Sequence, residues 1–214
     1  WSEAHVPGRH LNALLSAEDA VGLGLDEDAI EKHTRSAFRS YSGPVALPLN
    51  RSKIDGPIDK FLPHSIREGF HALHALVRYR DSAQALRIAE ASIETIFRYW
   101  APGRGWDYED LERVHNLNAP RAFSNFIWGL ARSIGPLVKY YRATGHGPAL
   151  ELAVVLKEKA ISEFFTEEGE YDVVKFGAHV HSVTCTMSSL AQLADLTSDS
   201  TVMGRVKRFY DNGL

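Results

Sequence analysis

Three segments of the chain end a helical stretch in the same way: Leu-Val-Arg-Tyr-Arg-Asp-Ser (76–82), Leu-Val-Lys-Tyr-Tyr-Arg-Ala-Thr-Gly (137–145) and Leu-Ala-Asp-Leu-Thr-Ser-Asp (193–199). Each is followed by a second stretch with the apolar spacing of an amphipathic helix. Recurrence at roughly 55–60 residues is typical of helix hairpins that stack on one another. The sequence therefore predicts a series of such hairpins.

The hairpin around the first of these turns indicates how the units are arranged. The stretch from Ile66 to Val77 is apolar on most faces, whereas residues 86–97 are apolar on one side and charged on the other. A helix that is apolar all round is buried, and a one-sided helix faces water. An inner helix followed by an outer one is typical of an α/α toroid. We predict an all-α fold of stacked antiparallel helix hairpins, a partial or complete (α/α)6 toroid, with inner helices near residues 9–21, 64–80, 120–141 and 180–196.

The remaining segments are expected to be loops. Residues 43–63 are dotted with Gly and Pro and have no periodicity, and only the run 171–174 could pair as a short strand. We expect residues 1–214 to form a single domain. Six hairpins at this period would need roughly 300 residues, so this domain is expected to be part of a longer chain.

Composition excludes several classes of function. The net charge of −3 and pI near 6.4 give no basic patch for nucleic acid, and no apolar run is long enough to span a membrane. The single thiol, Cys185, excludes a disulfide within the chain and any metal site built from several cysteines. We expect no cofactor and no metal. A cytoplasmic location is slightly favoured, and a homodimer stays open.

Inner helices of such a ring begin at one rim, so the loops before them are expected to meet there. Three loops carry aromatic, acidic or histidine residues, at 60–68, 100–110 and 176–182. Aromatic faces beside carboxylates suit a sugar site, because the ring stacks on the sugar while the acids act on the glycosidic bond. The candidate acid/base residues are Asp107, Glu109 and Glu68. The candidate substrate-binding residues are Trp106, Tyr108, His179, His181, His64 and Arg104.

Each candidate also has a purely structural interpretation. Trp106 could fill the core while the acids after it cap a helix, and the His-Ser pairs at 64–65 and 181–182 could be helix caps. Glu68 could be neutralised by Arg67 or Arg121. Cys185 fits a small core residue, because the sequence shows no electropositive neighbour for it.

One resemblance bears on function. Gly177-Ala-His-Val-His-Ser182, continuing to residues 193–199, resembles an inner helix of the six-hairpin glycosidases, most closely the bacterial β-L-arabinofuranosidase-like group. The resemblance implies a glycoside hydrolase that acts on an oligosaccharide, and polysaccharide lyases share the toroid. Members of that group hold a cysteine nucleophile and a zinc ion among several cysteines. This chain has only Cys185, so neither the nucleophile nor the zinc is carried over. Only His179 matches, as a rim histidine. The alternative is a non-catalytic scaffold that binds a peptide or protein partner.

Overall fold

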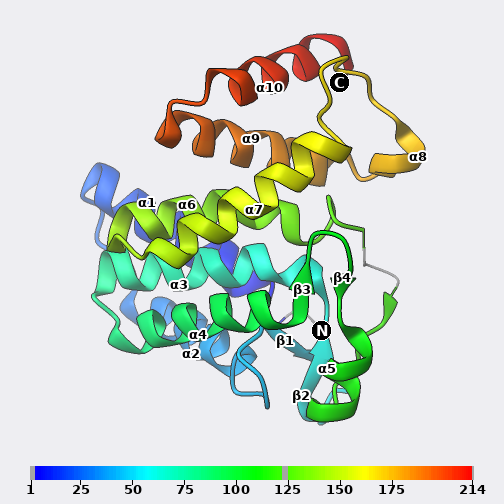
Figure 1. Ribbon diagram of the computed structural model, residues 1–214. Helices are drawn as coiled ribbons and strands as arrows, with labels where there is room; N and C mark the ends of the chain where they lie inside the picture. Colours follow the sequence, from blue (N-terminus) through cyan, green and yellow to red (C-terminus); the bar gives the residue numbers. More distant parts are fainter. Residues whose placement is uncertain (1–2, 122–124, 214) are drawn as a thin grey trace. The chain divides into compact units, whose positions relative to one another are not determined.

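The computed structural model describes residues 3–121 and 125–213 and is mostly helical, with 68% helix and 6% strand, which confirms the all-α class (Figure 1). The chain divides into two compact units, residues 1–122 and 123–214. Each unit has its own core, and each is described by itself. Closure into a toroid stays a prediction.

The first unit is built around one central helix, α3 (Ile66–Arg80), which packs against α1 (Val6–Val21) and α4 (Ala83–Tyr99). Side chains of α3 are buried on nearly every face, whereas α4 is buried along one stripe only. The predicted distinction between an inner and an outer helix is therefore confirmed for this pair. The other elements are α2 (Glu27–Ser40), β1 (Leu49–Arg51), β2 (Ile58–Phe61), η1 (Pro63–Ser65), β3 (Trp100–Ala101), β4 (Gly105–Trp106) and α5 (Tyr108–His115).

Two predictions about strands are wrong. The expected loop before Pro63 contains an antiparallel hairpin, β1 with β2, in which Leu49 pairs with Phe61 and both side chains are fully buried. Strands of three and four residues are too short to produce a readable alternation. In contrast, residues 171–174 do not pair as a strand. The carboxylate of Asp172 accepts hydrogen bonds from the N–H groups of Val174 and Lys175, which starts the short helix α8 (Val173–Phe176).

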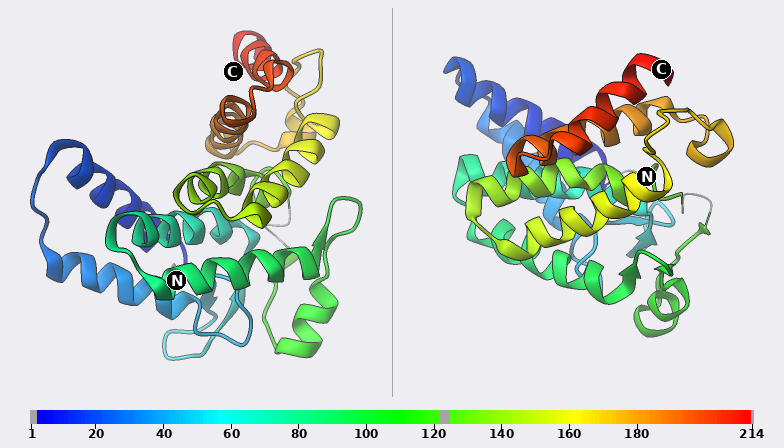
Figure 2. Two further views of the ribbon diagram at one scale, coloured as in Figure 1. Left: turned by 60° about the vertical axis from the view of Figure 1, so that its left-hand side comes forward. Right: turned by 45° about the horizontal axis from the view of Figure 1, so that its top comes forward.

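The second unit stacks two helix hairpins. Helix α9 (Val180–Thr197) packs chiefly against α6 (Ile134–Thr144), and α10 (Ser200–Gly213) runs antiparallel beside α9 (Figures 1 and 2). The core of the second unit contains an aromatic cluster. The ring centroid of Phe209 lies 4.8 Å from that of Phe165 and 5.1 Å from that of Phe176. The elements are η3 (Leu130–Ser133), α6 (Ile134–Thr144), α7 (Gly147–Glu163), α8, α9 (Val180–Thr197) and α10 (Ser200–Gly213).

The third inner helix begins later than predicted. It was expected over 120–141, but the regular α-helix starts only at Ile134, and residues 122–124 lie outside the described part of the chain. The side-chain oxygen of Asn125 accepts hydrogen bonds from the N–H groups of Ile127 and Trp128, which folds a turn in place of a helix. Helices are confirmed at the other three predicted positions by α1, α3 and α9, whereas their place as the inner helices of a ring stays a prediction.

The three repeated turns share one backbone conformation. Asp81, Gly145 and Ser198 follow α3, α6 and α9, and all three adopt the left-handed conformation with φ of 48°, 71° and 55°. The N–H groups of Ser82 and Asp199 then bond back to carbonyl groups in the last turn of the preceding helix. This is the helix-ending motif in which a left-handed residue lets the chain satisfy otherwise unpaired carbonyl groups. The repeat in the sequence is therefore a repeat of the turn itself.

Candidate functional site

Glu68 lies in the first turn of α3 and is fully buried. Its Oε1 atom accepts a hydrogen bond from Arg67 Nη1 at 2.7 Å and lies 3.6 Å from the Nε atom of Arg9, whose side chain is 46% exposed. Its Oε2 atom is buried and accepts no hydrogen bond from any described residue. Arg67 is therefore the neutralising partner that the sequence suggested. Arg121, the other suggested partner, binds Glu112 instead.

The first turn of α1 lies directly against this part of α3. A Cβ atom at Gly8 would overlap the backbone carbonyl group of Glu68, so only glycine permits so close an approach. One turn earlier in each segment, the rings of His5 and His64 stack, with centroids 4.9 Å apart and planes inclined by 14°. The structure thus brings two predicted site residues, His64 and Glu68, to the start of one helix, beside His5.

The pair His64-Ser65 is not a helix cap, which corrects one structural interpretation. No side chain caps α3 among the described residues. Ser65 is buried, and its hydroxyl oxygen accepts a hydrogen bond from Asn50 Nδ2 at 3.3 Å. The 3-10 turn η1 leads into the helix directly. The pair His181-Ser182 is not the cap of the helix that follows it either, because the N-cap residue there is His179.

Trp106 and Tyr108 form a second group around the hairpin that precedes α5. Trp106 is only 8% exposed and packs edge-on against Phe61, with ring centroids 4.8 Å apart. The guanidinium group of Arg121 lies 4.7 Å above the ring of Tyr108. Burial raises the pKa of Tyr108 to about 12, against the opposing effect of the Arg121 charge. Trp106 is therefore a core residue, and Arg121 covers one face of the Tyr108 ring.

The acidic residues of this group take part in helix capping and in ion pairs at the surface. The carboxylate of Asp107 caps α5 by accepting a hydrogen bond from the N–H group of Asp110 at 3.1 Å, and it also lies 3.2 Å from Arg104 Nη1. Glu109 is exposed. The guanidinium group of Arg121 donates to Glu112 and thereby lowers the pKa of that carboxyl group. The suggestion that acids after Trp106 cap the next helix is confirmed for Asp107.

His179 and His181 belong to the second unit, at the start of α9. The Nδ1 atom of His179 accepts a hydrogen bond from the N–H group of Ser182 at 3.1 Å and lies 2.8 Å from its hydroxyl oxygen, so His179 caps the helix. Its ring lies 5.9 Å from both Trp128 and His181. The Trp128 ring rests on Gly177, where a Cβ atom would overlap it.

Cys185 is half-buried one turn into α9, so the expectation of a core residue is wrong. Its Sγ atom lies 3.6 Å from His181 Nε2, a neighbour four residues earlier on the same helix. Spacing of four residues places two side chains on one face of a helix, so this contact could have been read from the sequence.

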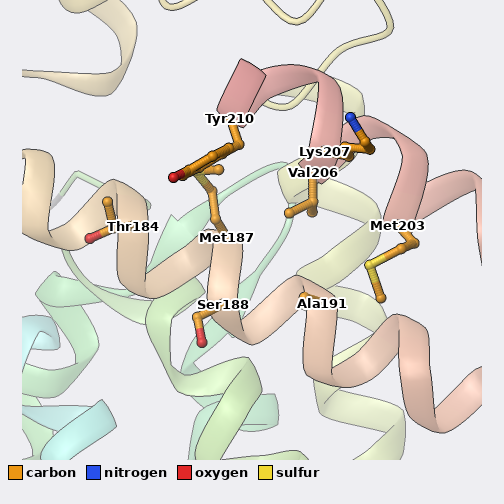
Figure 3. A pocket seen from close by; sticks show the side chains of 8 residues that line it. All are labelled: Thr184, Met187, Ser188, Ala191, Met203, Val206, Lys207 and Tyr210. Carbon is orange, nitrogen blue, oxygen red and sulfur yellow. The ribbon is translucent and has the colours of Figure 1, made fainter. Parts of the chain in front are cut away.

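An apolar groove of about 380 Å³ lies between α9 and α10 (Figure 3). Each helix contributes four side chains at positions i, i+3, i+4 and i+7, which is the spacing of one helix face. No carboxylate lines it. The lining residues are Thr184, Met187, Ser188 and Ala191 from α9, and Met203, Val206, Lys207 and Tyr210 from α10.

Within the described residues, no three His, Cys, Asp or Glu side chains are grouped as metal ligands would be. No helix in that part of the chain combines the length and the apolar character needed to cross a membrane.

The likeness to six-hairpin glycosidases rests on the sequence motifs alone, because no family model, curated protein or solved structure matches this chain.

Proposed function

We propose that the protein is a carbohydrate-active enzyme, a glycoside hydrolase, with Glu68 at the start of α3 as an acid/base residue. The observation that carries this proposal is the fully buried Glu68 carboxylate with one oxygen that the described residues leave without a hydrogen bond. Buried polar side-chain atoms are mostly hydrogen-bonded in folded proteins, so an exception calls for an explanation, of which a catalytic role is one. No group among the described residues competes for a proton at Glu68 Oε2, and substrate binding must expose this buried oxygen before it can exchange a proton with a glycosidic oxygen.

The neighbouring side chains fit a sugar site. The rings of His5 and His64 stack on each other, and flat ring faces of this kind suit the C–H face of a sugar ring. The ion pair between Glu68 and Arg9 reaches the surface, since Arg9 is nearly half exposed. Hydrolysis of a glycosidic bond needs a second carboxyl group. Asp107 and Glu109 stay the candidates for it in this unit.

The test is turnover of a panel of aryl glycosides and unsaturated uronides by the purified chain. Glu68→Gln is expected to abolish the activity, whereas Glu112→Gln, which also removes a carboxylate paired with an arginine, is expected to retain it. Removing one member of a buried ion pair destabilises a protein by about 3–5 kcal/mol, so each assay is run well below the thermal midpoint of its variant. Wild-type turnover by Glu68→Gln, or inactivity of the wild type on the whole panel, would overturn the proposal.

A second candidate function is favoured by the groove between α9 and α10. We propose as this alternative a scaffold that binds an amphipathic helix there. Inside the second unit, α9 already packs across the preceding hairpin, and the approach is close because a Cβ atom at Gly135 would lie 2.8 Å from the hydroxyl oxygen of Ser189. The groove lies on the hairpin of α9 and α10, which is the next hairpin of the same repeat after that of α6 and α7. Its occupant is therefore expected to be a helix with the small and apolar residues of α9.

This alternative is tested with a fluorescent peptide of residues 180–197, followed by anisotropy. Met203→Glu introduces a charge into the groove and is expected to weaken peptide binding at least tenfold. Thr201→Glu is the matched control, because Thr201 is exposed on the same helix and does not line the groove. Absence of peptide binding, or equal binding by both variants, would exclude this function.

A further inference from the structure

Two histidines outside the candidate site face each other across the first hairpin. His10 lies on α1 and His33 on α2, and His10 Nδ1 is 3.1 Å from His33 Nε2. The ring centroids are 4.6 Å apart and the planes are nearly perpendicular, at 87°. His10 is exposed and His33 is half-buried, so the pair lies at the surface of the first unit.

The separation of these nitrogens is close to that required by a metal ion. Zinc binds imidazole nitrogen at about 2.0–2.1 Å with tetrahedral angles, which sets two such ligands about 3.3–3.4 Å apart. The observed distance between His10 and His33 differs from that by only a few tenths of an ångström. Imidazole is also the ligand that zinc, copper and nickel share. The two lone pairs converge on one ion only if the rings rotate about their side-chain torsions, since each nitrogen now faces the other.

The positive charges beside the two histidines each lie near a carboxylate. Lys32 and Arg35, which flank His33 on α2, each pair with an acidic residue one turn earlier on that helix, Asp28 and Glu31. On α1, the guanidinium group of Arg9 is directed to the buried carboxylate of Glu68. The charges of Lys32 and Arg35 are therefore compensated, whereas Arg9 shares the single Glu68 carboxylate with Arg67.

We propose that His10 and His33 together bind a divalent transition-metal ion of the zinc type and thereby clamp α1 to α2, with water completing the coordination. In the hydrogen bond between the rings, one nitrogen carries the proton. Metal binding needs both lone pairs, so that proton moves to the other nitrogen of its own ring, and the neutral pair loses no proton overall. With two protein ligands the ion is held less tightly than in a structural zinc site, which has four.

Titration of the metal-free chain with zinc chloride, followed by calorimetry, tests this site. We expect at least tenfold weaker binding in both His10→Ala and His33→Ala. His181→Ala is the matched control, because it removes an exposed histidine that lies beside a different metal-binding side chain, Cys185. It should leave the histidine-pair binding unchanged.

A second measurement separates binding at the pair from binding elsewhere. Zinc should raise the thermal midpoint of the wild type and of His181→Ala, because a ligand that binds only the folded state stabilises it. It should not raise the midpoint of either single variant at the pair. No zinc binding, binding that survives both substitutions, or binding lost in only one of them would each overturn the proposal. None of these outcomes depends on glycosidase activity, so the site stands or fails independently of the proposed function.

Discussion

Gly8 and Gly204 are both helical glycines, and their surroundings predict opposite effects of the same substitution. A Cβ atom at Gly204 would meet no atom within 4 Å, whereas one at Gly8 would overlap the Glu68 carbonyl group. Alanine is favoured over glycine in a helix by about 1 kcal/mol. We therefore expect Gly204→Ala to stabilise the chain by about that amount. Gly8→Ala should instead destabilise it by about 1–3 kcal/mol, as overpacking usually does.

Urea denaturation of the two glycine variants measures both effects. Gly204→Ala serves as the control, since it shows that alanine is tolerated in a helix of this chain. If Gly8→Ala proved as stabilising as Gly204→Ala, the close crossing of α1 over the start of α3 would be wrong.

The hydroxyl group of Tyr108 offers a second prediction at the residue scale. It is buried and has no hydrogen-bond partner among the described residues. A buried polar group without a partner destabilises a protein, so Tyr108→Phe is expected to raise the free energy of unfolding by about 1 kcal/mol at pH 7. Thermal and urea unfolding would show this gain, and a clear loss of stability would contradict it.

The same residue predicts a difference at alkaline pH. The pKa of Tyr108 is raised from about 10 to about 12 by burial in the folded chain. Between these values the unfolded chain releases a proton that the folded chain retains, so the wild type loses stability as pH rises from 10 to 12. Tyr108→Phe lacks this contribution. Its advantage over the wild type should therefore widen across that window, as urea unfolding at successive pH values would measure.

Residues close in sequence were predictable, and residues brought together by the fold were not. Arg67 was correctly expected as a partner of Glu68, because the two are adjacent in a largely apolar helix. His5 and Arg9 complete the same group from the start of α1, about 60 residues earlier, and no local pattern marks them. Cys185 could have been paired with His181 from its spacing of four residues.

At the scale of elements, the repeated turns give a paired prediction. Ser198 and Gly145 occupy the same left-handed position after α9 and α6, but only glycine adopts it without strain. The strain for other residues is roughly 1–2 kcal/mol. We expect Ser198→Gly to stabilise the chain by about 1 kcal/mol and Gly145→Ala to destabilise it by a similar amount. Equal and opposite shifts of the urea midpoint would support one turn type at both places, whereas destabilisation by Ser198→Gly would contradict it.

The success of prediction for each element depended on its length and on how many faces it buries. Helix α3 and helix α4 were distinguished correctly because about fifteen residues are enough to show whether apolar side chains surround a helix. The strands β1 and β2 have only three and four residues and could not be seen. The late start of α6 depends on the Asn125 side chain bonding to the backbone, which apolar spacing does not report.

At the scale of the whole molecule, the sequence predicted one domain, whereas contacts divide the chain into units of residues 1–122 and 123–214. The two descriptions differ in how the chain should unfold. A single cooperative domain loses all its structure in one transition, while units with separate cores unfold in separate steps. Phe209 is suited to distinguish them, because it is fully buried in the aromatic cluster of the second unit.

Replacing Phe209 by Ala removes a buried aromatic ring and should destabilise the second unit by about 3–5 kcal/mol. Three of the four tryptophans, Trp1, Trp100 and Trp106, belong to the first unit, so fluorescence in a Trp128→Phe background reports on that unit alone. Circular dichroism reports on the helices of both units. In urea, we expect Phe209→Ala to shift the dichroism transition to lower denaturant while the fluorescence midpoint stays in place. A common shift of both probes would instead establish the single domain that the repeated hairpins predict, because it would mean that loss of one core unfolds the other.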